Sequence, residues 1–256
     1  IAQQIVLARQ ADWLAQADWL EDSDYPAEEW RTAEADLVGC SLAWQEGLAY
    51  YVPLRAPPGE PCLDAASALN VLRPMLEDPA VGKVGQNLKF DMVVLRTVGI
   101  ELKGLRFDSM MASYLLDAGE RVHNLDELAR RYLRHTNIKI DELIGTGRSQ
   151  RRMDEVPVAE VTRYAAEDAD VALRLYPILE GRLREEGLHA LFTDLELPLV
   201  EVLAAMEATG IRVDVDRLAR LSQRYEQRLK ELEAEIFRLA GRRPSALGAS
   251  GTPSCR

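Results

Sequence analysis

Residues 81–91 read Val-Gly-Lys-Val-Gly-Gln-Asn-Leu-Lys-Phe-Asp, and the hydrophobic pattern changes in the middle of this stretch. The first five residues predict a short buried strand. From Leu88 the apolar side chains recur three or four residues apart as far as Val98, which predicts a helix over about 88–98. A buried strand followed directly by a helix is the repeating unit of an α/β protein, so this stretch sets the expected fold class.

Similar patterns lie on both sides of it. Two strands over 37–44 and 47–54, joined by a turn at 45–47, predict a hairpin. A strand is expected at 104–107, and Asp108 follows it where a helix N-cap should be. The predicted helices cover about 3–20, 64–77, 88–98, 110–116 and 158–180, with an irregular acidic loop over 21–29. Strands that alternate with helices of this length favour an α/β sandwich over a helix bundle.

The chain divides into four predicted parts. Residues 1–35 form an atypical N-terminal segment, 36–194 the main domain, 195–240 a helical segment, and 241–256 a tail rich in Gly, Ser and Pro that is expected to be disordered. Pro198 marks a helix start and Gly210 a helix end. The last helix carries an apolar seam from Leu218 to Leu239 on an otherwise charged surface, which also suggests self-association.

Composition limits the class of protein. The 256 residues are 47% hydrophobic and 29% charged, as in ordinary globular proteins. We find no apolar run of about 20 residues that would span a bilayer, and no signal-peptide pattern at the start. The cytoplasm is therefore the expected location. Three scattered cysteines predict free thiols instead of a disulfide framework.

The net charge of −11 argues against a protein that holds nucleic acid mainly through its overall field. Basic residues nevertheless gather between Arg130 and Arg152. They form a candidate contact surface for a DNA backbone, although a solvated charged surface explains them as well.

Three side chains are candidates for chemistry. Tyr164 and Asp168 are four residues apart on a predicted helix, so they share one face. Asp91 falls in the first turn of a helix that follows a strand, where ligand sites open in α/β sheets. Hydrolysis of a phosphodiester by two metal ions needs such carboxylates to hold Mg²⁺ or Mn²⁺. Each position also has an ordinary structural explanation.

Several stretches, in the right order, resemble one known family. Residues 84–91 resemble the second exonuclease motif of family A DNA polymerases, the DNA polymerase I type. Residues 163–170, Arg-Tyr-Ala-Ala-Glu-Asp-Ala-Asp, resemble the third motif in its tyrosine-containing form. Residues 107–116 and 123–129 resemble the region between these motifs, and 196–214 the segment that enters the polymerase thumb. The resemblance covers roughly 36–240.

The resemblance implies the RNase H-like fold of DEDD-type 3′-5′ exonucleases, a mixed sheet flanked by helices and followed by a helical thumb segment. It implies proofreading in DNA replication and repair, acting on a single-stranded 3′ end of DNA. Asp91 and Asp168 would be metal ligands for two Mg²⁺ or Mn²⁺ ions, and Tyr164 would orient the attacking water. DNA would contact Gln86, Asn87, Arg148, Arg151 and Arg152.

The first family motif, an Asp-x-Glu on the central strand, has no clear counterpart. Counting back from Leu37 reaches Asp24, but Pro26 stands where the Glu should be and disfavours a central strand. Asp22 is a substitute at a slightly different spacing. Losing two of four carboxylates should weaken metal binding.

Two other functions remain open: a non-catalytic scaffold of the same fold, and an exoribonuclease. The polymerase catalytic motifs are not found. Composition changes at about 36 and 241 suggest the hypothesis that both ends are unrelated to the domain between them.

Overall fold

The computed structural model describes residues 5–11, 37–147 and 150–241; for residues 5–11 it describes the backbone alone. The chain separates into two compact units, residues 1–209 and 210–256. Each unit is described by itself. The predicted acidic loop over 21–29, Asp22, Asp24 and Arg148 lie outside the described residues, and so does the predicted disordered tail apart from Gly241.

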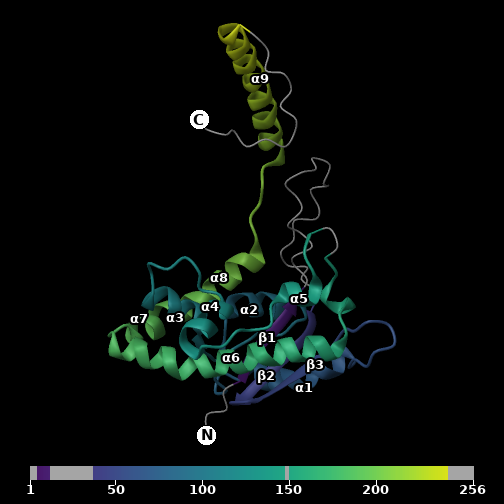
Figure 1. The fold of residues 1–256 in the computed structure, drawn as a ribbon, viewed down its shortest axis with the longest axis vertical. Helices are drawn as coiled ribbons and strands as arrows, with labels where there is room; N and C mark the ends of the chain where they lie inside the picture. Colours follow the sequence, from purple (N-terminus) through teal and green to yellow (C-terminus); the bar gives the residue numbers. More distant parts are fainter. Residues whose placement is uncertain (1–4, 12–36, 148–149, 242–256) are drawn as a thin grey trace. The chain divides into compact units, whose positions relative to one another are not determined.

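The first unit contains one mixed five-stranded sheet (Figure 1). Its strands lie in the order β3-β2-β1-β4-β5. The central strand β1 runs antiparallel to β2 and parallel to β4. The strands are β1 (Ile5–Ala11), β2 (Leu37–Gln45), β3 (Leu48–Pro53), β4 (Lys83–Gly85) and β5 (Leu105–Asp108). This arrangement confirms the predicted α/β, RNase H-like fold, including the hairpin of β2 and β3.

The predicted helix over 3–20 is wrong, because residues 5–11 form the central strand β1. Ile5 and Val6 are β-branched, and the backbone pairs with β2 on one side and β4 on the other. Pairing with two neighbours outweighs the helical propensity of the Ala, Leu and Gln around it. The centre of the sheet is therefore filled by a strand that the sequence pattern did not show.

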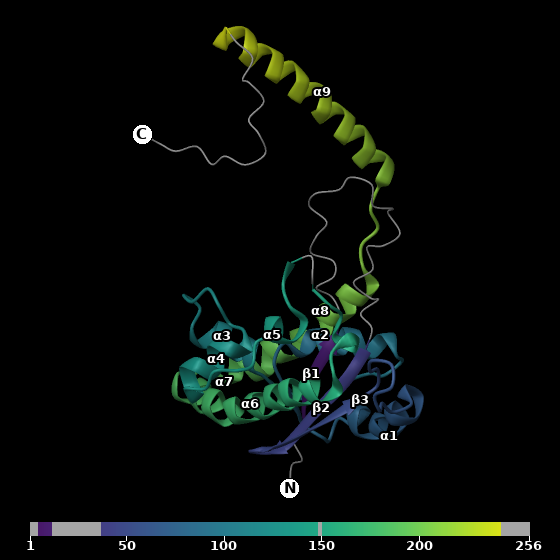
Figure 2. The same ribbon diagram turned by 45° about the vertical axis from the view of Figure 1, so that its right-hand side comes forward.

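Helices cover both faces of the sheet (Figures 1 and 2). The long helix α6 packs against β1, β2 and β3. The helices of this unit are α1 (Ala65–Glu77), α2 (Leu88–Thr97), α3 (Ser109–Leu116), α4 (Leu125–Leu128), α5 (Ile140–Ile144), α6 (Val158–Glu185), α7 (His189–Leu191) and α8 (Leu197–Thr209), with π-helical turns η3 (Ala129–Leu133) and η6 (Phe192–Glu196) and the 3₁₀ turn η5 (Met153–Glu155). The predicted helices from residue 64 onward are confirmed.

The core has two main layers. One joins the face of β2 that carries Cys40 and Leu42 to α1, α2 and α8. The other surrounds Phe107 of β5, whose ring contacts Tyr176 of α6 and Phe192 of η6. A smaller cluster places Tyr51 and Tyr164 beside Val38. These layers fix α2 and α6, the helices that carry the candidate site, on the same sheet.

The second unit contains the helix α9 (Val215–Ala240). The side chain of Asp214 caps its start by accepting a hydrogen bond of 2.9 Å from the Arg217 N–H, and Gly241, with φ +68°, ends it. None of the residues of α9 is buried. In the described part of the chain, no helix is long and apolar enough to cross a membrane.

Candidate active site

A single buried carboxylate, Asp108, holds the turn that leads into α2. It accepts hydrogen bonds from the backbone N–H groups of Asn87 (3.1 Å) and Leu88 (2.7 Å) at the start of α2. It also accepts from Met110 (2.9 Å) and Met111 (3.3 Å) at the start of α3. Burial raises the pKa of Asp108, and the four N–H groups counteract part of this rise. The predicted N-cap is confirmed, and Asp108 serves a second helix as well.

Asn87 and Gln86 form the turn itself. Asn87 has a left-handed backbone with φ 58°, which Asn tolerates better than most residues. Both polar atoms of the Gln86 side-chain amide form hydrogen bonds. Nε2 donates to the His123 carbonyl (2.8 Å), and Oε1 accepts from the Ser109 hydroxyl. Gln86 therefore links three chain segments, and contact of either residue with DNA stays a prediction.

Asp91 lies one turn further along α2 and is buried, with 4% of its surface exposed. Burial, with a further contribution from the negative charge of Asp91, raises the pKa of Cys40 to about 12. The charge of Asp91 therefore acts on Cys40 of β2. Cys40 pairs with Arg9 of β1 in the sheet register, and α2 itself contacts β1, so Asp91 lies close to the central strand.

Tyr164 and Asp168 are brought together on α6, as their spacing predicts. Burial raises the pKa of Asp168 to about 8, although a hydrogen bond from Tyr164 acts in the opposite direction. The negative charges of Asp126 and Glu167 raise this pKa further, and Asn137 lowers it. Burial and the neighbouring acids therefore favour the protonated form of Asp168 more than in an exposed aspartate.

Sequence reasoning missed the loop that supports Asp168. Glu167 accepts hydrogen bonds from the ring Nε2 of His135 (2.8 Å) and the Ile138 N–H (2.7 Å). Between them, Asn137 is 4% exposed, and its amide has no hydrogen-bond partner of ordinary geometry among the described residues. Asp126 lies in a stretch that carries the family resemblance, which could have identified it. No sequence signal points to Asn137.

A pocket of about 330 Å³ opens beside this loop. Basic and acidic side chains both line the pocket. Two of the lining residues, Asp126 and Asn137, also shift the pKa of Asp168. Its volume is at the lower end of that of ordinary ligand sites. The pocket is lined by Val122, Asn124, Asp126, Glu127, Arg130, His135, Thr136, Asn137 and Lys139.

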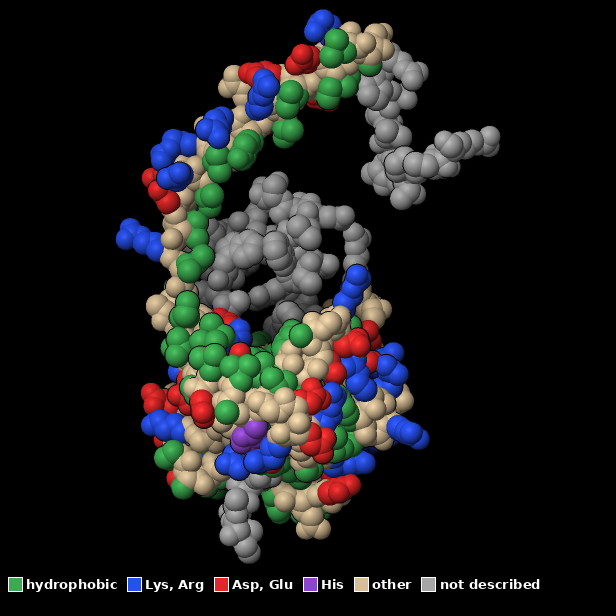
Figure 3. Space-filling view, turned by 90° about the vertical axis from the view of Figure 1, so that its left-hand side faces the viewer, with side chains coloured by type: hydrophobic (Ala, Val, Ile, Leu, Met, Phe, Trp, Pro, Cys, Tyr) green, Lys and Arg blue, Asp and Glu red, His purple; other side chains and the backbone are tan. Residues whose placement is uncertain are grey.

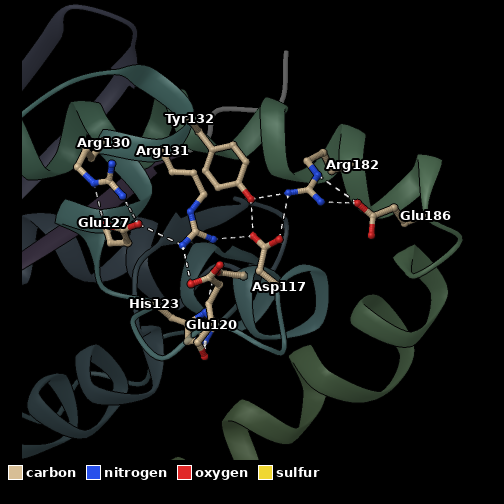
Figure 4. Close-up of polar contacts among 10 residues, drawn as sticks. Asp117, Glu120, His123, Glu127, Arg130, Arg131, Tyr132, Arg182 and Glu186 are labelled. Atoms are coloured by element: carbon tan, nitrogen blue, oxygen red, sulfur yellow. Dashed lines mark hydrogen bonds and ion pairs between the residues drawn. The ribbon is translucent and has the colours of Figure 1, made fainter.

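Arg130 and Arg131, at the start of the basic stretch, are neutralised locally (Figure 4). Arg130 donates two hydrogen bonds to Glu127 (2.9 and 2.6 Å), and Arg131 forms ion pairs with Asp117 and Glu127. Burial would raise the pKa of Asp117, but the hydrogen bond from Tyr132 and the charges of Arg182 and Arg131 lower it overall. This network stabilises the junction of η3 and α6.

The two described arginines that the sequence assigns to DNA also have internal partners. Arg151 donates from Nε to the Leu143 carbonyl (2.8 Å), and Arg152 pairs with Asp154 (3.1 Å). Nearly half of each side chain is exposed (43% and 48%), so a phosphate could still reach them. Their role in binding DNA stays a prediction.

Asp170, the last residue of the stretch that resembles the third motif, has partners inside the protein. It accepts a hydrogen bond of 2.6 Å from the Gly47 N–H, in the turn between β2 and β3. It also lies 3.6 Å from the Arg174 guanidinium. Asp170 therefore attaches α6 to the hairpin, because its carboxylate satisfies a donor of the tight turn.

The described residues do not fit a paired-metal site. Across residues 37–147 and 150–241, no three His, Cys, Asp or Glu side chains are grouped to hold a metal ion. The central strand β1 reads Ile-Val-Leu-Ala-Arg-Gln-Ala and contributes no carboxylate. Among the described residues this leaves Asp91 and Asp168 as the two carboxylates that the family resemblance assigns to a metal site, and Asp22 and Asp24 lie outside these residues.

Comparison with known proteins identifies the family. Residues 27–184 match the 3′-5′ exonuclease family. DNA polymerase I of Pseudomonas aeruginosa is 40% identical over 226 residues, and that of Rhizobium leguminosarum is 41% identical over 229. The matched parts are 84% and 82% of this chain but only 25% and 22% of those relatives, so the chain spans about a quarter of their length.

Solved structures show the same fold at low sequence identity. The POL domain of Pol1 from M. smegmatis, in complex with DNA primer-template and dNTP, superposes with a TM-score of 0.69 at 21% identity and covers 97% of this chain and 36% of its own. Brucella melitensis NrnC with bound Mg²⁺ gives a TM-score of 0.54 at 17% identity, covering 80% and 84%. The chain therefore belongs to the 3′-5′ exonuclease family that is found in DNA polymerase I.

Proposed function

We propose that this chain is the domain of a DNA polymerase I-type protein that receives a single-stranded 3′ end of DNA, and that hydrolysis of the end is weak or absent in it. The family membership supports the substrate class. The observation that carries the proposal is the pocket beside the loop that supports Asp168, whose walls include Lys139 and also Arg130, which pairs with Glu127. A lysine at such a site attracts a phosphate, and the side-chain amides of Asn124 and Asn137 add hydrogen-bonding groups for a base or sugar.

The proposal that hydrolysis is weak or absent rests on β1. Its residue Leu7 pairs with Gly85 at the end of β4, and Arg9 pairs with Cys40, so the strand runs past the turn that leads to Asp91. The first carboxylate motif of the family belongs on the central strand, and β1 carries none. Asp91 and Asp168 would remain as the two family carboxylates, with Tyr164 beside the second.

Catalytic hydrolysis by two Mg²⁺ or Mn²⁺ ions is the alternative. It requires Asp22, Asp24 or a neighbouring residue to complete the site, and a Mn²⁺ affinity typical of a paired-metal site would support it. No observation in the structure favours an exoribonuclease, and competition between DNA and RNA oligonucleotides tests that function directly.

Binding is tested by fluorescence anisotropy with a 5′-labelled single-stranded DNA in EDTA, which separates binding from cleavage. The oligonucleotide is used with a free 3′ end and with a bulky 3′ block. We expect the protein to prefer the free end, and Lys139→Gln to reduce that preference because it removes a cation from the pocket. Lys103→Gln is the matched control, since Lys103 precedes β5 at the opposite end of the parallel strands and pairs with Glu101. Equal loss in both variants, or equal binding of both DNA ends, would contradict the proposal.

A further inference from the structure

Tyr114 of α3 presents an aromatic ring at the surface of the first unit. Half of its side chain is exposed (50%). The ring packs on the imidazole of His123, with the two ring centroids 4.1 Å apart and the ring planes tilted by 34°. The protein therefore supports the tyrosine ring from one side and leaves much of the ring open to a ligand.

The support under this ring is fixed in place. His123 is buried, and both of its ring nitrogens have partners: Nδ1 lies 2.8 Å from the Ser113 hydroxyl and Nε2 lies 3.2 Å from the Glu120 carbonyl (Figure 4). The carbonyl of His123 also accepts the hydrogen bond from Gln86, at the turn that leads into α2. Because the imidazole cannot turn without losing these contacts, Tyr114 is held in advance, and a ring held in advance loses little conformational entropy when a ligand stacks on it.

Tyr114 lies beside the pocket and next to a free cation. His123 is preceded by Val122 and followed by Asn124, and both of these neighbours line the pocket. Arg121, one residue earlier, is exposed and forms no ion pair with another described residue. An aromatic ring, a positive charge and the pocket are therefore found close together around one short loop.

The surface of the first unit has no large area of positive charge on the face that Figure 3 shows. Lys and Arg side chains there are mixed with Asp and Glu, and the whole chain has a net charge of −11. Proteins that bind single-stranded nucleic acid combine cations for the backbone with aromatic side chains on which bases stack. Where the cations are few, stacking has to contribute a larger share of the affinity.

We propose that Tyr114 is a stacking platform for a base of single-stranded DNA, and that the stacked nucleotide lies upstream of the 3′-terminal nucleotide held in the pocket. The ligand is a nucleobase because the ring stands between the exposed Arg121 and the polar pocket, and a nucleotide brings both a flat ring and a phosphate to such a place. This inference rests on the proposed function, since it takes the pocket as the place of the 3′ end.

The platform is tested by fluorescence anisotropy of the full chain with a 5′-labelled oligo(dT) in EDTA. Tyr114→Ala should weaken binding roughly tenfold. Tyr114→Phe and Tyr114→Trp should keep the affinity within about twofold, because stacking needs the ring and not the hydroxyl. Equal affinity of Tyr114→Ala and the wild type overturns the inference.

Tyr50→Ala is the matched control. Tyr50 is also about half exposed (47%) and stacked on another ring, that of Trp44, with centroids 5.0 Å apart. It lies on β3, whereas α3 follows β5, and these two strands are the opposite edges of the sheet. Tyr50→Ala should therefore bind DNA as the wild type does, and circular dichroism checks that both alanine variants are folded. The same loss of affinity in both variants overturns a specific role for Tyr114.

Salt dependence separates stacking from charge. Tyr114→Ala should lower the affinity by the same factor at every KCl concentration, because removal of a neutral ring changes the number of released counterions very little. Removal of one phosphate contact would instead reduce the slope of log affinity against log salt by about 0.7. A reduction of that size in Tyr114→Ala overturns stacking as the role of the ring.

An abasic nucleotide, moved stepwise away from the 3′ end, locates the stacked base. At one internal position it should weaken binding by the wild type about as much as Tyr114→Ala does, and it should have little further effect on that variant. Full additivity of the two changes at every position overturns the inference.

The oligonucleotide with a blocked 3′ end tells failure of this inference from failure of the proposed function. Tyr114→Ala should weaken binding of the free and the blocked oligonucleotide by the same factor, and so keep the preference for the free end. Equal binding of both ends by the wild type contradicts the proposed function and the place of the stacked nucleotide upstream of the pocket. A preference for the free end without any effect of Tyr114→Ala contradicts the platform alone.

Discussion

The carboxylate of Asp108 accepts a hydrogen bond of 2.7 Å from the backbone N–H of Leu88, and so connects the end of β5 to the start of α2. Because three further N–H groups share this carboxylate, the position of Asp91 one turn later depends on the hydrogen bonds that Asp108 accepts.

Replacing Asp108 therefore tests what holds the turn. Asp108→Ala should lower the free energy of unfolding by about 3 kcal/mol, since it leaves buried N–H groups without an acceptor. Asp108→Asn, which keeps one carbonyl oxygen, should cost about half as much. Urea unfolding monitored by circular dichroism measures both, and equal stability of Asp108→Ala and wild type would show that the turn does not need this cap.

The buried Lys83 should make the free energy of unfolding depend on pH. Its side chain is fully buried on β4, and Nζ donates to the Asp78 carbonyl (2.6 Å). Burial lowers the pKa of Lys83 to about 8, although the charge of Asp78 partly opposes this. Between pH 8 and about 10.4 the unfolded chain keeps a proton that the folded chain has lost, so this lysine makes stability rise with pH across that window.

Lys83→Met should remove that rise, which is on the order of 2 kcal/mol. The Asp78 carbonyl keeps its hydrogen bond from the Val81 N–H, so the substitution leaves no buried acceptor without a partner. Thermal unfolding of both proteins between pH 6 and 10 measures the difference. Parallel stability curves would mean that Lys83 stays charged in the folded state.

Gly39 and Tyr51 predict an energetic coupling across β2 and β3. A Cβ atom at Gly39 would overlap the hydroxyl and ring of Tyr51. Gly39→Ala should therefore destabilise the domain by about 2 kcal/mol through overpacking. In a Tyr51→Ala background the same substitution should lower the free energy of unfolding much less, because the Tyr51 ring that the new methyl group would overlap is absent. Equal costs in the two backgrounds, measured by chemical denaturation, would exclude the predicted contact.

The position of β1 predicts that two carboxylates introduced on this strand would create nuclease activity. Leu7 and Arg9 are two residues apart, as the two acids of an Asp-x-Glu motif are, and Arg9 pairs with Cys40, the thiol whose pKa responds to Asp91. Leu7→Asp/Arg9→Glu should therefore create measurable 3′-5′ cleavage of single-stranded DNA with Mn²⁺. The same acids one residue later, in Ala8→Asp/Gln10→Glu, should not, because successive strand residues point to opposite faces. Activity in both variants, or in neither when both fold, would contradict this placement.

The sequence predicted most of the first unit because its patterns are local. The hairpin, the strand and helix at 83–97, the Asp108 cap and the pairing of Tyr164 with Asp168 each depend on residues close together in the chain. The central strand was missed because Ile5–Ala11 gains its structure from β2 and β4, more than 25 and 70 residues away respectively. Asn137 and Glu167 were missed for the same reason, since their contacts join a loop to α6. The assignments of 195–240 to a thumb and of Gln86, Asn87 and the arginines to DNA stay predictions.

The most direct test of the account is digestion of a 5′-labelled single-stranded DNA by the wild-type chain with Mg²⁺ or Mn²⁺, beside Asp91→Ala/Asp168→Ala. Circular dichroism confirms that both proteins are folded. The account predicts that the wild type binds the oligonucleotide and shortens it slowly or not at all. Rapid stepwise shortening from the 3′ end by the wild type, lost in the double variant, would contradict the account and show that another residue completes the metal site.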